Sequence, residues 1–352
     1  EIVSKPDIRG AEEAKAYLQE LRAIARYLGV SDADMEKGQL RCDVNISLRP
    51  TDWEDTRFSP KTEIKNVNSF RSVERAIKYE TARQTELWEV GTPPQITTTR
   101  GWNDTKQCTE EQRTKEDAAD YRYFPDPDIA PLRFAYGNAK DANTIDVQKL
   151  EAQLPELPNK KRQRFMSEIG LTLSESNDII YDQNLAGYFE QVISELESWA
   201  SDTKSISWEK DKGKLIKSAA GWLTSKLLKL LSDKGQTIKD TKANPENFAE
   251  LIIMLQTNVI NSPTGQKVLE FMNEKGGDPS NIVADNNWGQ ISDSSELESI
   301  VKTVIAANDK SVADYKAGKQ NALQFLLGQV MKQSKGKANP QTTTELLKSL
   351  LN

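Results

Sequence analysis

The hydrophobic pattern of this chain changes once, near residue 138, and that change limits the folds open to it. Before it, segments with an apolar residue at every second position alternate with two helical segments. After it, apolar residues recur every three or four positions, with almost no strand pattern. We therefore predict an α+β domain over residues 1–137, an all-α domain over 138–282 and, around a break at 276–294, a small all-α tail over 283–352.

The first domain has clear signals for individual elements. Helices are expected at 11–30 and 69–90, and Ser69 is the expected N-cap of the second helix. Strand patterns occupy 40–49, 61–66, 95–103 and 120–132. The strands are short and polar on one side, so we expect a mostly antiparallel sheet.

Composition restricts the chemistry. The 352 residues include no histidine, so neither a Ser-His-Asp triad nor an imidazole metal site can come from this chain. A metal would have to sit on oxygen ligands, which favours Mg²⁺ or Ca²⁺. Two cysteines provide no disulfide framework. No apolar run approaches the length of a membrane span, so we expect no membrane association and a cytoplasmic or organellar-matrix location.

The segment "LRCDVNISLR" at 40–49 has an unusual polar side. Its odd positions carry Arg41, Asp43, Asn45, Ser47 and Arg49, whereas its even positions are apolar or cysteine. The segment "KTEIKN" alternates in the same way and adds three more charged residues: Lys61, Glu63 and Lys65.

Two carboxylates, an amide and a hydroxyl on one face form a partial oxygen shell for Mg²⁺, and neighbouring cations suit phosphate. The alternative is a solvated face with cross-strand ion pairs. The chain has neither a G-x-x-x-x-G-K-[ST] nor a G-x-G-x-x-G phosphate loop.

A third candidate lies between residues 97 and 128, where Arg100 and Arg122 occur near several aromatic residues. These arginines have the chemistry to hold phosphate or the 3′ end of a nucleic acid. Alternatively, the aromatic residues belong to the core and the arginines stack on them.

Near the C-terminus, residues 315–344 contain five lysines and no carboxylate, although the net charge of the chain is −6. An apolar stripe at 323–331 would seat a helix, and Gly336 and Pro340 would end it. Lys332, Lys335 and Lys337 would then lie at the helix end, suited to phosphate contacts. The alternative is a patch that only increases solubility.

Six collinear motifs resemble those of the B subunit of the glutamine-dependent aspartyl/glutamyl-tRNA amidotransferase. They are "EIVSKPDIRGAEEA", "RCDVNIS", "KTEIKNVNSF", "DYRYFPDPDI", "LPELP" and "GKQNALQFLLGQVMKQSKGKANP". The resemblance implies a cradle-shaped catalytic domain, of which this chain holds a part, then a helical domain and a tail similar to YqeY proteins. It also implies partners, namely an amidase A subunit, a small C subunit and misacylated Glu-tRNA(Gln) or Asp-tRNA(Asn).

The chemistry implied by the resemblance is phosphorylation of the side-chain carboxylate by ATP with Mg²⁺, followed by attack of ammonia. On this sequence it assigns the metal to Asp43 and Glu63, with Asn45 and Lys61 as further catalytic residues. It assigns tRNA binding to the tail lysines. We group as candidate nucleotide ligands Arg41, Ser47, Lys65, Arg100 and Arg122.

Some features depart from the family pattern. Members carry further cradle residues, including a histidine and acidic ligands, before the position that corresponds to Glu1. Members also commonly differ from this chain at Lys5 and Ala119. We therefore expect an incomplete metal shell here, and no amidation by this chain alone. The alternative is a non-catalytic module for tRNA binding or assembly.

Overall fold

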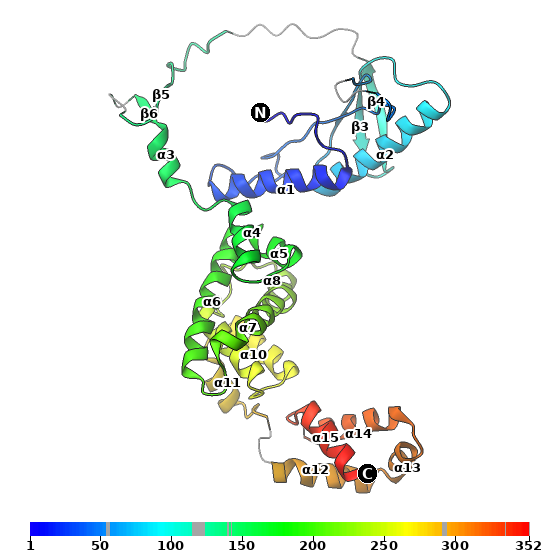
Figure 1. The fold of residues 1–352 in the computed structure, drawn as a ribbon, viewed down its shortest axis with the longest axis vertical. Helices are drawn as coiled ribbons and strands as arrows, with labels where there is room; N and C mark the ends of the chain where they lie inside the picture. Colours follow the sequence, from blue (N-terminus) through cyan, green and yellow to red (C-terminus); the bar gives the residue numbers. More distant parts are fainter. Residues whose placement is uncertain are drawn as a thin grey trace. The chain divides into compact units, whose positions relative to one another are not determined.

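The computed structural model describes residues 1–53, 57–114, 124–138, 141, 143–290, 294–334 and 336–351. The chain forms two compact units, Glu1–Gln163 and Arg164–Asn352 (Figure 1). The first is mixed α and β, and the second is helical in its described residues. The predicted α+β class with helices toward the C-terminus is confirmed. The three domain boundaries remain a prediction.

The first unit is built on a four-stranded sheet in the order β1-β2-β3-β4. Its strands are Val44–Ile46, Thr62–Lys65, Thr98–Asn103 and Cys108–Thr114. The β1–β2 and β3–β4 pairs are antiparallel. The β2–β3 pair is parallel. Helix α2 (Phe70–Glu89) connects the two strands and carries the chain back to the end of the sheet at which β2 began.

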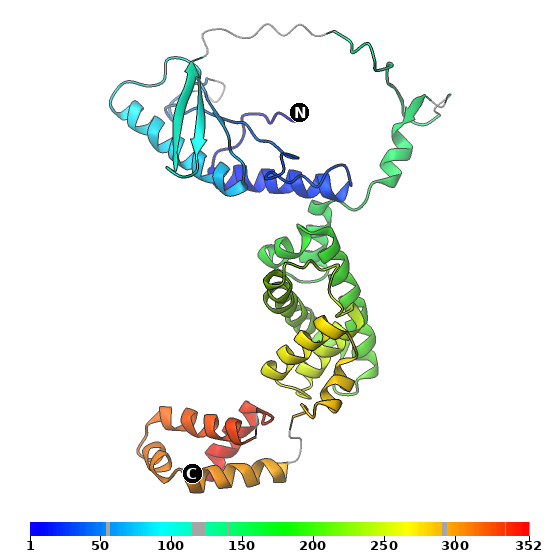
Figure 2. The ribbon, with the colours of Figure 1, turned by 180° about the vertical axis from the view of Figure 1, so that it is seen from behind.

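One face of this sheet packs on α2, which in turn packs on α1 (Ala11–Tyr27) (Figure 2). The apolar core between them includes Leu18 of α1, Ile64 of β2, Val73 of α2 and Trp102 of β3. The predicted helices are confirmed in place. As expected, Ser69 caps α2 by accepting a hydrogen bond from the Ser72 amide at 3.0 Å.

The predicted strands need several corrections. Only Val44–Ile46 of the expected strand at 40–49 is paired, because its sole neighbour in the sheet is the four-residue β2. Residues 124–132 form no strand, and three prolines there lack the N–H that a ladder requires. Residues 120–123 of that expected strand lie outside the described residues.

Three strands were not predicted. β4 reads "CTEEQRT" and carries almost no apolar signal, so its pairing with β3 defines it. A small parallel pair, β5 (Arg133–Ala135) and β6 (Thr144–Asp146), precedes α3 (Val147–Gln153). β6 lies beyond residue 138, where we expected almost no strand, and its three residues are too few for a periodic signal.

The second unit consists of helices. Helix α4 (Pro158–Ser167) crosses the boundary between the two units. Phe165, Phe189 and Phe248 are completely buried in the core of the second unit. The remaining helices before residue 290 are α5 (Leu173–Ile180), α6 (Gln183–Asp202), α7 (Trp208–Trp222) with the π-helical turn η1 (Leu223–Leu227), α8 (Leu228–Asp233), α9 (Pro245–Gln256), α10 (Ser262–Lys275) and α11 (Pro279–Asp285).

Four more helices follow: α12 (Ser294–Ala307), α13 (Asp309–Lys316), α14 (Gln320–Gln333) and α15 (Pro340–Leu351). They share an apolar cluster that includes Leu323, Leu326 and Val330, so the predicted stripe on α14 is confirmed. No helix among the described residues is both long and apolar enough to span a bilayer.

The Ser69 cap gives a stability prediction. Ser69→Ala is expected to lower the free energy of unfolding by about 1 kcal/mol, because it leaves an amide at the start of α2 without its acceptor. Urea denaturation followed by circular dichroism measures this loss. Ser201→Ala is the control, since that hydroxyl only bonds back to the Glu197 carbonyl within α6. Equal stabilities for wild type and Ser69→Ala would contradict the assigned cap.

Candidate functional site

The sheet face that points away from α2 is polar on all four strands, and we call it the polar face. Pairing places Asn45 opposite Glu63, Glu63 beside Thr99, and Lys65 beside Gly101. Directly paired residues point to the same side of a sheet. Gly101 in turn pairs with Glu110 of β4. The predicted sharing of one face by the two motifs is therefore confirmed for their paired residues.

The two candidate metal carboxylates converge on one cation. The Lys65 ammonium lies 3.7 Å from an oxygen of Asp43 and 3.5 Å from an oxygen of Glu63. The second oxygen of Glu63 accepts a hydrogen bond of 3.0 Å from the Thr99 hydroxyl. The Glu63 side chain is 14% exposed, whereas that of Asp43 is 48% exposed. Glu63 is thus held firmly at the centre of the face, and Asp43 lies at its open edge.

This arrangement fits part of a magnesium shell. Two carboxylates already share a single positive group, and the Asn45 amide is the cross-strand neighbour of Glu63. Mg²⁺ in phosphoryl-transfer sites is commonly held by one or two carboxylates, with waters and substrate phosphates completing the octahedron. The described residues contain no group of three or more acidic or cysteine side chains placed to hold a metal. The donors present therefore suit a metal that also binds phosphate.

Other predicted ligands occupy different positions. Arg41 and Lys61 are exposed, in the extended segments just before β1 and β2. Ser47 follows β1 and is half-buried. Arg122 lies outside the described residues, so its predicted role as a nucleotide ligand stays a prediction.

The structure does not bring Arg100 to the polar face. Its Nε donates to the Thr109 hydroxyl at 2.8 Å, and one Nη donates to the Thr109 carbonyl at 2.8 Å. Trp102, two residues along the strand, packs in the core beneath α2. Arg100 is therefore on the α2 side of the sheet. Alternation along β3 places Arg100 on the side opposite Glu63, and its predicted role as a ligand for phosphate stays a prediction.

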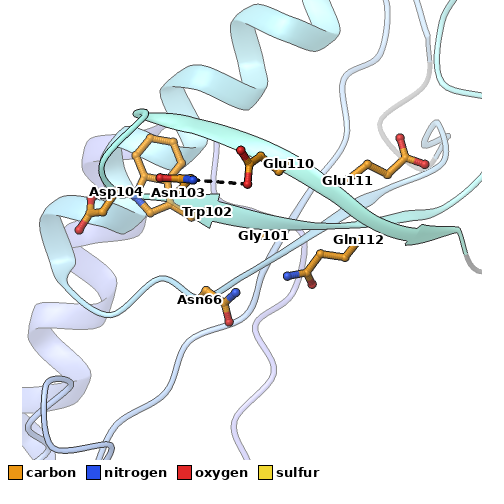
Figure 3. A pocket seen from close by; sticks show the side chains of 8 residues that line it. All are labelled: Asn66, Gly101, Trp102, Asn103, Asp104, Glu110, Glu111 and Gln112. Carbon is orange, nitrogen blue, oxygen red and sulfur yellow. Dashed lines mark hydrogen bonds between the residues drawn. The ribbon is translucent and has the colours of Figure 1, made fainter.

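Sequence reasoning missed a shallow hollow that continues the polar face. It measures about 340 Å³, and Asn66, Gly101, Asn103 and Gln112 are among its lining residues (Figure 3). A side chain at Gly101 would meet the Gln112 amide, since an added Cβ would lie 2.5 Å from Gln112 Nε2. Asn66 adopts a φ of 64°, in the left-handed region. The sequence signal for this site was the asparagine after "KTEIK", in a conformation that asparagine tolerates better than most residues.

Cys42 is next to this face and has an altered acidity. Burial, and secondarily the charge of Asp43, raise the pKa of its thiol to about 11. At pH 8 a smaller fraction of Cys42 than of a free cysteine is in the reactive thiolate form. Because a thiolate of higher pKa is a stronger nucleophile, this loss of reactivity is offset in part. We expect iodoacetamide to modify Cys42 roughly 20-fold more slowly in the folded chain than in urea. Mass spectrometry measures both rates, and equal rates would contradict the burial of the thiol.

The same thiol affects stability at high pH. Its pKa is raised in the folded state, so folding favours the protonated form. The contribution of Cys42 to the free energy of unfolding is fully present below about pH 8.5, the approximate pKa of an unfolded cysteine. It is lost as the pH rises toward 11. Cys42→Ala should reduce that part of the alkaline loss of stability, measured by urea denaturation between pH 8 and 11.

Two of the tail lysines, Lys332 and Lys337, lie at the end of α14 as the sequence predicted. α14 ends at Gln333, and the chain turns through Gly336 at a φ of 80°, with the Gly336 amide donating to the Met331 carbonyl at 2.7 Å. Lys332 is exposed in the last turn of α14, and Lys337 is half-buried after it. No ion pair is formed by either residue within the described ranges. Lys335 lies outside the described residues.

The fold and the polar face together define a class: an α+β unit with a surface suited to a metal and phosphate, followed by a helical unit. Comparison with known proteins is more specific. Residues 1–138 match the family model described as the GatB/GatE catalytic domain, and residues 209–351 match the GatB domain.

Two relatives show the extent of the similarity. The B subunit of the aspartyl/glutamyl-tRNA(Asn/Gln) amidotransferase of Carboxydothermus hydrogenoformans is 40% identical over 354 residues, covering 100% of this chain and 67% of the relative. The protein of the same name from Persephonella marina is 41% identical over 351 residues, covering 100% of this chain and 68% of the relative. The chain belongs to the family of amidotransferase B subunits, and it spans about two thirds of the length of these relatives.

Proposed function

We propose that the polar face is part of the centre at which a tRNA-dependent amidotransferase activates a carboxylate with ATP. The observation that carries the proposal is the convergence of Asp43 and Glu63 on the single ammonium of Lys65. Family membership supports an amidotransferase role, because the relatives are named as amidotransferase subunits for Asn and Gln tRNAs. The substrates are then Glu-tRNA(Gln), Asp-tRNA(Asn) or both.

The proposed reaction has two steps. An oxygen of the tRNA-linked side-chain carboxylate attacks the γ-phosphorus of ATP, and ADP leaves with the electrons of the broken P–O bond. Ammonia then attacks the acyl carbon, phosphate leaves, and one proton is lost to give the neutral amide. The first step turns a poor electrophile into one with a good leaving group.

In that scheme the residues of this chain bind the metal ion and the phosphates and orient them for the reaction. Asp43 and Glu63 would hold Mg²⁺, with Asn45 beside them, and Thr99 keeps Glu63 in one orientation through its hydrogen bond. When bound, the ion would neutralise phosphate charge. Lys61, Lys65 and Arg41 supply cations for phosphate oxygens. Phosphoryl transfer depends on positioning and charge rather than on a protein nucleophile, so a chain without histidine can contribute to it.

The partners follow from the same proposal. An amidase A subunit supplies ammonia from glutamine, and a small C subunit completes the assembly. The tail contacts the tRNA backbone through Lys332, Lys335 and Lys337. Since these contacts involve phosphates, they hold the tRNA without reading its bases.

The test is ATP hydrolysis by the assembled amidotransferase that contains this chain. We expect ADP formation that requires Mg²⁺ and is stimulated by misacylated Glu-tRNA(Gln) or Asp-tRNA(Asn). Uncharged tRNA is the control, because it lacks the carboxylate that accepts phosphate. Binding of misacylated tRNA without any stimulation of hydrolysis would instead support a non-catalytic module for tRNA binding or assembly.

A further inference from the structure

A buried charged network lies behind the polar face, between α2 and the sheet. Glu80 of α2 is completely buried. Its carboxylate accepts hydrogen bonds from Arg83 Nε at 3.0 Å, Gln84 Nε2 at 2.9 Å and the Thr109 hydroxyl at 3.0 Å. Burial by itself raises the pKa of Glu80, but these donors outweigh it and the pKa is lowered. A buried charge with this many donors is held in one geometry.

The network is connected to strands β2, β3 and β4 and to the segment that follows β1. Gln84 accepts from the Leu48 amide, just after β1, at 3.1 Å and donates to the Thr62 hydroxyl of β2 at 3.2 Å. Thr109 belongs to β4, and its hydroxyl also accepts from Arg100 of β3 at 2.8 Å. The Gln84 amide uses both of its donors and accepts one hydrogen bond. Two adjacent turns of one helix are thus hydrogen-bonded to β2, β4 and the residue Leu48 after β1, and Glu80 forms an ion pair of 3.8 Å with Arg100 of β3.

The strand residues that this network contacts are neighbours in sequence of residues on the polar face. Thr62 immediately precedes Glu63, and Arg100 immediately follows Thr99. Successive residues of a strand point to opposite sides, so fixing Thr62 and Arg100 from behind fixes the residues in front of them. Glu63 and Thr99 are themselves joined by the 3.0 Å hydrogen bond.

We infer that Glu80 and Gln84 are positioning residues that set the relative placement of β1, β2 and β3, and thereby the oxygen atoms of Asp43 and Glu63. An apolar helix face would bury the sheet equally well, but it would not specify the register of strands only three to six residues long. The inference rests on the function proposed for the polar face. Groups that orient metal ligands commonly change metal affinity or activity 10- to 100-fold when they are altered.

The first variant is Glu80→Gln, which keeps the shape and removes the charge. In the assembled amidotransferase we expect about a tenfold loss of amidation kcat and about tenfold weaker binding of Mn²⁺, a probe for Mg²⁺ that electron paramagnetic resonance detects. Thr62→Val and Thr62→Ser form a milder pair. Val removes the hydroxyl that bonds Gln84 and should shift both quantities in the same direction, whereas Ser keeps it and should restore them to within about twofold of wild type.

The matched control is Glu74→Gln, also on α2. Glu74 bonds Lys15 of α1 and Lys78 of α2, both at 2.8 Å, and forms no hydrogen bond to a described strand. Wild-type Mn²⁺ affinity and kcat in Glu80→Gln and Thr62→Val would overturn the inference, and so would an equal loss in Glu74→Gln. If the Glu80→Gln chain does not assemble with its partner subunits, the comparison of Thr62→Val with Thr62→Ser tests the inference. Asp43→Asn is measured alongside: wild-type behaviour in that variant would refute the proposed function itself.

Discussion

Replacing Asp43 by Asn, or Glu63 by Gln, in the assembled amidotransferase should lower tRNA amidation at least 100-fold. Each change keeps the size of the side chain and removes one of the two negative charges that converge on Lys65. Removal of one key electrostatic group from a reaction centre typically costs 10² to 10³ in rate. The rate is measured with misacylated tRNA, ATP and free ammonia, so that supply of ammonia by the partner subunit does not limit it.

Two controls separate this effect from general damage. Glu74→Gln removes an equivalent charge from the contact between α1 and α2, more than one turn along α2 from the sheet contacts of Glu80. It should leave amidation within about twofold of wild type, because Glu74 bonds only Lys15 and Lys78 among the described residues. Glutaminase activity of the partner subunit should fall much less than amidation in the Asp43 and Glu63 variants. Amidation at the wild-type rate in both variants would show that these carboxylates do not hold the metal.

The second large effect concerns the tail lysines. Changing Lys332, Lys335 and Lys337 together to Gln should weaken tRNA binding about equally for cognate and non-cognate tRNA. The plot of log K against log salt should flatten by roughly 2–3 units, because each phosphate contact contributes about 0.7–0.9. At low salt this corresponds to a loss of affinity on the order of 100-fold. Filter binding over a range of salt concentrations measures both quantities.

A matched triple variant tests whether position matters or only charge. Lys302, Lys310 and Lys348 are exposed residues of the same helical cluster, away from the turn after α14. Their replacement by Gln removes the same charge and should change the salt slope by less than about one contact. Equal slopes for the two triple variants would contradict the proposed phosphate contacts and would support the alternative that the lysines at the turn only increase solubility.

The polar face could be predicted from sequence because, in both of its motifs, charged or amide side chains recur at every second position. Asp43, Asn45, Glu63 and Lys65 occupy alternate positions, and an alternating pattern fixes which side of a sheet a residue faces. It does not fix how many of the residues are paired. Only three residues of the segment 40–49 belong to β1, because the length of β2 limits the pairing, and a single sequence does not reveal that length.

Arg100 and β4 show why the rest could not be predicted. Arg100 was predicted as a candidate ligand for phosphate, and its position in β3 turns it toward Glu80 and Thr109, on the side of the sheet that faces α2. β4 has no apolar alternation and is defined only by its partner β3. The hollow at Gly101 depends on three segments that meet only in the folded chain. The helices were easier, since Ser69 and the α14 stripe are local signals.

The most direct measurement of the central claim follows oxygen from the substrate into phosphate. Misacylated tRNA whose glutamyl or aspartyl side-chain carboxylate carries ¹⁸O at both oxygens is amidated by the assembled enzyme with ATP, Mg²⁺ and ammonia, and the released phosphate is analysed by mass spectrometry. We predict one ¹⁸O in the phosphate for each amide formed, and loss of amide and labelled phosphate together in Asp43→Asn and Glu63→Gln. Amide formation with unlabelled phosphate, or labelled phosphate at the wild-type rate in both variants, would contradict the account.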